Sequence, residues 1–199
     1  LEEAVAAERA GVDLIVARGS EGGGHGRQEV ATLPLLQSVL ESVETPVLAA
    51  GGVATARGLA AVLAAGAAGA WVGTAFLACP EADSSDAARE RLLAATDTDT
   101  AYGRVFDVAQ GLGWPPEYGG RSLRNAYFDE WVGREQELAG DPDAARALTE
   151  AREARDFDTA YVYAGTGVGM LRESRPAAEV VAGLAGAREL LRRAPESFA

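Results

Sequence analysis

The run from Gly22 to Gly26 (GGGHG) places the only histidine of the chain, His25, among four glycines. An imidazole can take up a proton near neutral pH or, once protonated, face an anionic ligand. The run directly follows an apolar segment, Asp13 to Arg18, which is typical of a parallel strand buried on both faces. His25 is therefore predicted to lie at the carboxyl end of a strand, where α/β enzymes carry their active sites. The alternative is a solvent-exposed loop histidine without a role.

Glycines also follow two further apolar segments. Gly51 and Gly52 come after residues 45–50 and before a predicted helix, and Gly73 and Thr74 lie within residues 70–76. Glycine lets a ligand approach the backbone, and free amides at a helix N-terminus bind anions. These positions are candidates for a phosphate site, as the last two strand-to-helix loops of a (β/α)8 barrel often are. The other interpretation is that Gly51 and Gly52 form only a tight turn.

Two other features are interpreted as structural. The glycines from Gly165 to Gly169 lack the full spacing of a dinucleotide-binding loop, and no acidic strand end follows them. That segment, with Tyr163, is expected to roof the entrance of a site or to form a plain turn. Cys79 is expected to be a buried thiol, and no metal site is predicted.

The first 80 residues alternate between predicted helices and strands. Helices are expected near residues 1–10, 32–43 and 56–65, and strands near residues 13–18, 45–50 and 70–76. This order implies βαβ units with right-handed crossovers, and therefore a parallel sheet. A doubly wound sheet and part of a (β/α)8 barrel both satisfy the pattern.

Beyond residue 80 the pattern becomes mainly helical. Residues 97–100 are expected to form a polar turn, and residues 111–124 a loop rich in glycine and proline. Further helices are predicted near residues 86–95, 126–139, 142–155 and 177–193.

Composition limits the partners of the chain. Its 199 residues include 18 basic and 30 acidic side chains, a formal charge of −12. Binding to nucleic acid or to an acidic membrane needs clustered cations, so neither partner is expected. The uncharged residues 58–79 are mostly alanine and glycine, which favours a buried helix and strand over a membrane span. A single cysteine is consistent with a cytoplasmic setting. Because the chain begins at Leu1 within a predicted helix, its natural N-terminus is expected upstream.

Three motifs occur in order along the chain: residues 10–26 (AGVDLIVARGSEGGGHG), 46–53 (PVLAAGGV) and 69–76 (GAWVGTAF). Together they resemble the nitronate monooxygenase family, formerly called 2-nitropropane dioxygenases, whose members are FMN-dependent (β/α)8 barrels. The resemblance implies that residues 1–96 are the C-terminal part of such a barrel and hold its last three βα units. Residues 97–199 would be a mostly helical extension that packs on the barrel within the same domain.

The resemblance also assigns roles to individual residues. His25 matches the active-site histidine of the family and would be catalytic. Many members have glutamine at the position of Arg18, so here a fixed positive charge would lie near the flavin ring or make a different contact. The positions that match cofactor contacts of the family are Arg18, Gly23, Gly51, Gly52, Trp71, Val72, Gly73 and Thr74.

The function implied by the resemblance is the oxidation of alkyl nitronates by O2 to a carbonyl compound and nitrite, with FMN as cofactor. His25 would bind the nitronate anion or take the α-proton of a neutral nitroalkane. FMN-dependent NAD(P)H:quinone reductases and an enoyl-acyl-carrier-protein reductase use a related scaffold and form the alternative. A third interpretation is an inactive half-barrel whose open strand edges drive association, so homo-oligomerisation stays open.

Overall fold

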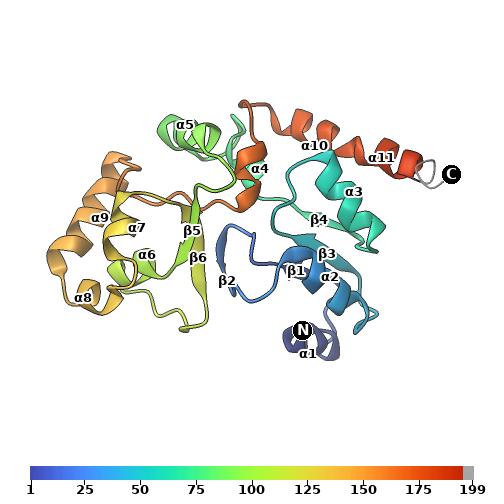
Figure 1. Ribbon diagram of the computed structural model, residues 1–199, viewed down its shortest axis with the longest axis horizontal. Helices are drawn as coiled ribbons and strands as arrows, with labels where there is room; N and C mark the ends of the chain where they lie inside the picture. The colour runs from blue at the N-terminus through green and yellow to red at the C-terminus, as the bar shows by residue number, and fades with distance from the viewer. Residues whose placement is uncertain (195–199) are drawn as a thin grey trace.

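The computed structural model describes residues 1–194 and contains a three-stranded parallel sheet (Figure 1). Its strands are β1 (Ile15–Arg18), β3 (Val47–Ala50) and β4 (Gly69–Trp71), in the order β1-β3-β4. Ala49 of β3 lies opposite Ala17 on one side and Ala70 on the other. The helices α1 (Glu2–Arg9), α2 (Thr32–Leu40) and α3 (Ala56–Ala64) precede these strands in turn. The predicted alternation and the parallel sheet are therefore confirmed.

Helices α1–α3 cover one face of this sheet. Ile15, Ala17, Val47 and Ala49 are buried on that face, where they pack with apolar side chains of the three helices. The residues between them point to the opposite face, and Val16 there is 40% exposed. Burial of this strand on both faces is thus a wrong expectation for the described residues. The physical reason is that strand side chains alternate in direction, and the three helices all pack on one side.

A second, antiparallel sheet lies beside the first. It contains β2 (Gly24–Gly26), β6 (Gly119–Leu123) and β5 (Thr100–Gly103), in the order β2-β6-β5. The residue types predict loops over β2 and β6, because glycine has little preference for strands. Pairing between segments distant in sequence forms the sheet instead, with His25 opposite Gly120. His25 therefore lies on a short strand rather than in a loop.

The end of the molecule opposite the parallel sheet is helical (Figure 1). Phe106, Tyr127, Phe128 and Trp131 form an aromatic core there with two buried leucines. The single helix predicted over residues 126–139 is two helices, because Gly133 between them adopts a positive φ of 80°. The helices of this end are α6 (Val105–Ala109), α7 (Ala126–Trp131), α8 (Glu135–Ala139) and α9 (Pro142–Ala154).

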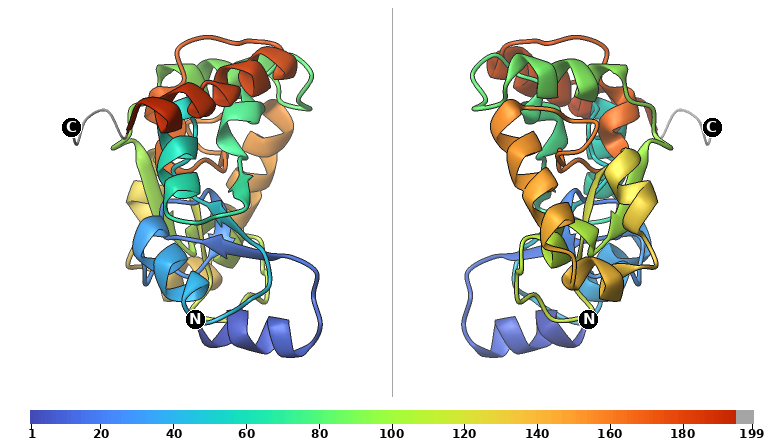
Figure 2. Two further views of the ribbon diagram at one scale, coloured as in Figure 1. Left: turned by 90° about the vertical axis from the view of Figure 1, so that its right-hand side faces the viewer. Right: turned by 90° about the vertical axis from the view of Figure 1, so that its left-hand side faces the viewer.

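The C-terminal helices return to the parallel sheet. α10 (Ala177–Ala185) and α11 (Ala187–Arg193) both contact α3 and lie at the opposite end of the view from α1 (Figure 2). The remaining short elements are α4 (Thr74–Leu77), α5 (Asp86–Ala94) and the 3-10 helix η1 (Thr166–Met170). The strand predicted over residues 70–76 is therefore correct only to Trp71. Cys79 is buried as predicted, and within residues 1–194 no helix is long and apolar enough to cross a membrane.

Candidate active site

A cavity of about 370 Å3 lies at the carboxyl ends of the three parallel strands. Loops from β1, β3 and β4 reach it together, because parallel strands end at the same edge of a sheet. Val72 is not among the lining residues and packs against the neighbouring apolar clusters. The sequence-predicted residues that line the cavity are Arg18, Gly23, His25, Gly51, Gly52, Trp71, Gly73 and Thr74.

The loop after β3 requires glycine. Gly51 and Gly52 have φ angles of +109° and +71°, which side chains rarely adopt. A Cβ atom on Gly51 would lie 2.6 Å from Thr32 Oγ1 and 3.0 Å from the amide nitrogen of Gly22. Thr32 Oγ1 also lies 3.0 Å from the carbonyl oxygen of Gly51 and 2.9 Å from a carboxylate oxygen of Glu21. These contacts of Thr32 hold the loop on the side that faces away from the cavity. The other side of the loop stays open towards the cavity.

A segment far along the chain closes the side of the cavity next to β4. The hydroxyl of Thr74 accepts a hydrogen bond of 3.0 Å from the backbone amide of Gly165, which directly precedes η1. Gly23 packs so closely on this segment that a Cβ there would lie 2.6 Å from the amide nitrogen of Gly165. Tyr163, Gly165 and Gly167 also line the cavity, so the segment expected to roof a site does border one.

Arg18 holds the glycine-rich loop that follows β1. Its Nη2 donates to the carbonyl oxygens of Gly22 and Gly24 at 2.5 and 2.8 Å. Burial lowers the pKa of the Arg18 guanidinium, and the nearby Tyr102 partly offsets that effect. Arginine remains charged even so. The Arg18 side chain therefore contacts the loop and also lines the cavity, and its position near a flavin ring stays a prediction.

The imidazole of His25 is surrounded by groups from several elements. Its Nε2 lies 2.7 Å from Oδ1 of Asp107, a residue of α6 whose side chain is 1% exposed. Trp114 stacks on the ring, with centroids 4.3 Å apart and an interplanar angle of 11°. Tyr163 approaches the ring edge-on, with centroids 5.3 Å apart. Only 18% of the His25 side chain is exposed, so a freely solvated loop histidine is the wrong interpretation.

Asp107, Trp114, Thr32 and Glu21 are the parts of this site that sequence reasoning missed. Asp107 stands 82 residues from His25, and no local pattern connects the two. Burial raises the pKa of the Tyr163 hydroxyl, and the charge of Asp107 raises it further. The Tyr163 hydroxyl therefore stays neutral.

The fold and the cavity define an α/β protein with its candidate site at the carboxyl ends of parallel strands, the place where α/β enzymes bind their ligands. The family model for nitronate monooxygenase matches residues 1–186. The chain therefore belongs to the nitronate monooxygenase family, a family of oxidoreductases.

Individual proteins are similar to this chain in sequence and in structure. The chain is 35% identical over 192 residues to a nitronate monooxygenase of Pseudomonas aeruginosa, an alignment covering 90% of this chain and 52% of that protein. A solved nitroalkane oxidase from Streptomyces ansochromogenes superposes with a TM-score of 0.78 at 35% identity, over 96% of this chain and 56% of that one. FabK from Thermotoga maritima superposes with a TM-score of 0.82 at 28% identity, over 100% and 61%. The chain thus spans about half the length of the curated relatives it matches.

Proposed function

We propose that residues 1–96 form three consecutive βα units of a (β/α)8 barrel, and that residues 97–199 pack on it within the same domain. The last five residues lie outside the part that the structure describes. The helices α1–α3 cover one face of the parallel sheet, which supports the proposal because a doubly wound sheet carries helices on both faces. In a barrel, the face that carries Val16 and Arg18 would be the interior.

We propose further that the cavity binds FMN. Its volume falls within the usual range for small-molecule sites, about 300–1,000 Å3. Backbone amides at Gly51, Gly52 and Gly73 would hold the phosphate, and the hydroxyl of Thr74 can donate to it while accepting from Gly165. Trp71 is 62% exposed at the rim and offers an aromatic face. Arg18 and Gly23 line the same space, while Val72 would contribute through its backbone alone.

The proposed reaction is the oxidation of alkyl nitronates by O2. Bound flavin supplies the electron-accepting chemistry, and the protein positions the reactants. Atoms balance when two nitronate anions and one O2 give two carbonyl compounds and two nitrite ions. His25 would bind the nitronate anion or take the α-proton of a neutral nitroalkane, and the aromatic rings around it limit the access of water. This proposal rests on the position of His25 on the cavity wall, where its imidazole contacts the buried Asp107.

The superposition with FabK favours a second candidate on the same scaffold, an FMN-dependent NAD(P)H:quinone or enoyl-acyl-carrier-protein reductase. The two candidates differ in the source of electrons. Rapid bleaching of bound flavin by NADH or NADPH supports the reductase, whereas O2 consumption with propane-2-nitronate and no nicotinamide supports the oxidation of nitronates.

His25→Ala tests the role of the histidine. We expect the unaltered protein to be purified with stoichiometric FMN. The variant should still hold its FMN but should lose about 100-fold or more in the rate of nitronate oxidation. Arg188→Ala, on the exposed side of α11, serves as the control and should retain the full rate. Failure of the folded chain to bind added FMN would overturn the cofactor assignment. Unchanged rates with both propane-2-nitronate and neutral 2-nitropropane would remove His25 from the reaction.

A further inference from the structure

We infer that Asp107 is the positioning residue for His25: it holds the hydrogen of the imidazole on Nε2 and leaves Nδ1 as the nitrogen that takes the α-proton of a neutral nitroalkane. The inference deepens the proposed function and rests on it for the substrate. The tautomer that it assigns to His25 can be measured without any substrate.

A hydrogen bond joins the side chains of Asp107 and His25. The Asp107 carboxylate projects from α6 and is 1% exposed, and its Oδ1 lies 2.7 Å from Nε2 of His25. Within residues 1–194, the other oxygen, Oδ2, is buried without a hydrogen-bond partner. An ionised carboxylate only accepts hydrogen bonds, so Nε2 must carry the hydrogen. That bond is the single side-chain hydrogen bond of Asp107 among the described residues, so the carboxylate pairs with His25 and with no second cation there.

Nδ1 of His25 has no hydrogen-bond partner within residues 1–194, although the ring lines the cavity. In the Nε2–H tautomer this atom carries a free lone pair. It is therefore the ring atom able to accept a proton from a ligand in the cavity.

Two aromatic side chains hold the imidazole ring of His25 in place. Trp114 lies parallel to one face, and Tyr163 meets the ring at an interplanar angle of 60°. The space for Tyr163 depends on Gly120, opposite His25 on β6, because a Cβ there would lie 2.8 Å from a ring carbon of Tyr163. These contacts and the bond to Asp107 leave the imidazole one orientation, as a base aimed at a bound substrate requires.

The chemistry follows from this arrangement. The α C–H bond of the nitroalkane breaks, its electron pair forms the C=N bond of the nitronate, and the proton forms a new bond to Nδ1. The imidazolium that results lies beside the Asp107 carboxylate, which stabilises the charge that develops. A nitronate that is already ionised needs no such proton transfer. Asp107 should therefore matter for neutral nitroalkanes far more than for preformed nitronates.

Ring-15N labelling of histidine tests the tautomer directly, because the chain has one histidine and the spectrum holds one pair of ring-nitrogen signals. At about pH 8.5 we expect a protonated Nε2 and a bare Nδ1 in the unaltered protein. In Asp107→Asn the side-chain amide can donate to Nε2, which should move the hydrogen to Nδ1. Asp129→Asn, which removes an exposed carboxylate on α7, should leave the spectrum unchanged.

Kinetics of the same variants test the consequence. We expect Asp107→Asn to retain FMN and to lose about 100-fold or more in turnover of neutral 2-nitropropane, with less than about 3-fold loss for propane-2-nitronate. Asp107→Glu, which restores an acceptor, should recover the original tautomer and part of the lost rate. A native tautomer in Asp107→Asn, or equal losses on both substrates, would overturn the inference. A switched tautomer in a protein that oxidises neither substrate would instead sustain the positioning role and overturn the proposed reaction.

Discussion

At the scale of single residues, the site combines positions that short motifs predict with partners that they do not. His25 and the glycines after β1, β3 and β4 are recognisable because they lie in short motifs that directly follow apolar segments. Asp107 and Thr32 are ordinary residue types within helices, and their importance lies in what they contact. Thr32 donates a hydrogen bond to the carbonyl oxygen of Gly51, and Asp107 contacts the imidazole of His25. Short motifs therefore identify the residues that face a ligand more readily than the residues that hold those side chains and loops in place.

Gly51→Ala should weaken FMN binding before it affects the rest of the fold. The added methyl would collide with Thr32 Oγ1, and a positive φ of 109° is strained for alanine. We expect the affinity for FMN to fall about 10-fold or more, measured by flavin fluorescence titration, while the far-ultraviolet circular dichroism stays unchanged.

Gly183→Ala is the matched control for that experiment. Gly183 lies within α10, and nothing approaches within 4 Å of the position that its Cβ would take. Alanine there should leave FMN binding intact and raise helix stability by up to about 1 kcal/mol. Equal FMN affinity in both variants would contradict the phosphate-loop assignment.

At the scale of elements, caps and stop signals in the sequence predict helices better than strands. Thr55 starts α3 by accepting a hydrogen bond from the amide of Gly58, and Asp141 with Pro142 starts α9. Such signals are local, since a cap contacts residues two or three positions away. The segments GHG, TAYG and GGRSL of β2, β5 and β6 carry no comparable signal. They are strands because they pair with one another.

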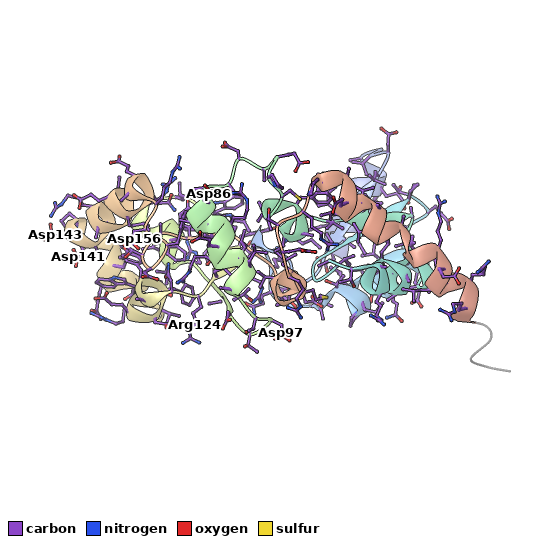
Figure 3. All side chains as sticks on the ribbon, turned by 90° about the horizontal axis from the view of Figure 1, so that it is seen from above. Asp86, Asp97, Arg124, Asp141, Asp143 and Asp156 are labelled. Carbon is purple, nitrogen blue, oxygen red and sulfur yellow. The ribbon has the colours of Figure 1, made fainter. Side chains whose placement is uncertain are left out.

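Asp141→Ala should destabilise the helical end of the protein. Asp141 Oδ1 accepts hydrogen bonds from the amides of Asp143 and Ala144 at 2.9 and 3.0 Å, and Figure 3 shows this residue at the outer end of the molecule near Asp143 and Asp156. Loss of an N-cap usually costs about 1 kcal/mol of the free energy of unfolding. Urea denaturation should show that decrease.

Glu150→Ala provides the comparison on the same helix. Glu150 is exposed, and its ion pair with Arg146 is long, at 3.9 Å. Exposed pairs of this kind contribute little, so a change within about 0.5 kcal/mol is expected. A loss in Glu150→Ala as large as in Asp141→Ala would argue against the cap as the cause.

At the scale of the whole molecule, the two sheets place the site between two differently built halves. The parallel sheet and its helices provide the glycine loops, and the antiparallel sheet with the aromatic helical end provides His25 and Asp107. Tyr127 ties α7 to α9 in the helical half, because its hydroxyl donates to the carbonyl oxygen of Ala144 at 3.0 Å. Burial raises the pKa of this hydroxyl to about 12.

Stability should consequently decline in alkaline solution. Below about pH 10 the Tyr127 hydroxyl is neutral in both states, and between about pH 10 and 12 the unfolded chain ionises while the folded protein does not. The free energy of unfolding should fall over that window by at most about 2–3 kcal/mol from this group. Because the chain contains no lysine, the window is free of lysine titration.

Tyr127→Phe separates this contribution from the others. The variant should lose about 1 kcal/mol at neutral pH through the missing hydrogen bond, and its unfolding free energy should decline less steeply above pH 10. Urea denaturation at several pH values measures both effects. Parallel curves for the two proteins would contradict the assignment to Tyr127.

The amino-acid sequence was sufficient to predict the parallel strands, the helices that begin at strong caps, and the glycine and histidine positions around one sheet edge. All of these follow from the polarity and the backbone preferences of neighbouring residues. The antiparallel sheet, the break near Gly133 and the pairing of His25 with Asp107 came from the folded structure. Each depends on contacts or backbone geometry that packing between distant segments selects, and a partner 82 residues away leaves no periodic trace in the chain.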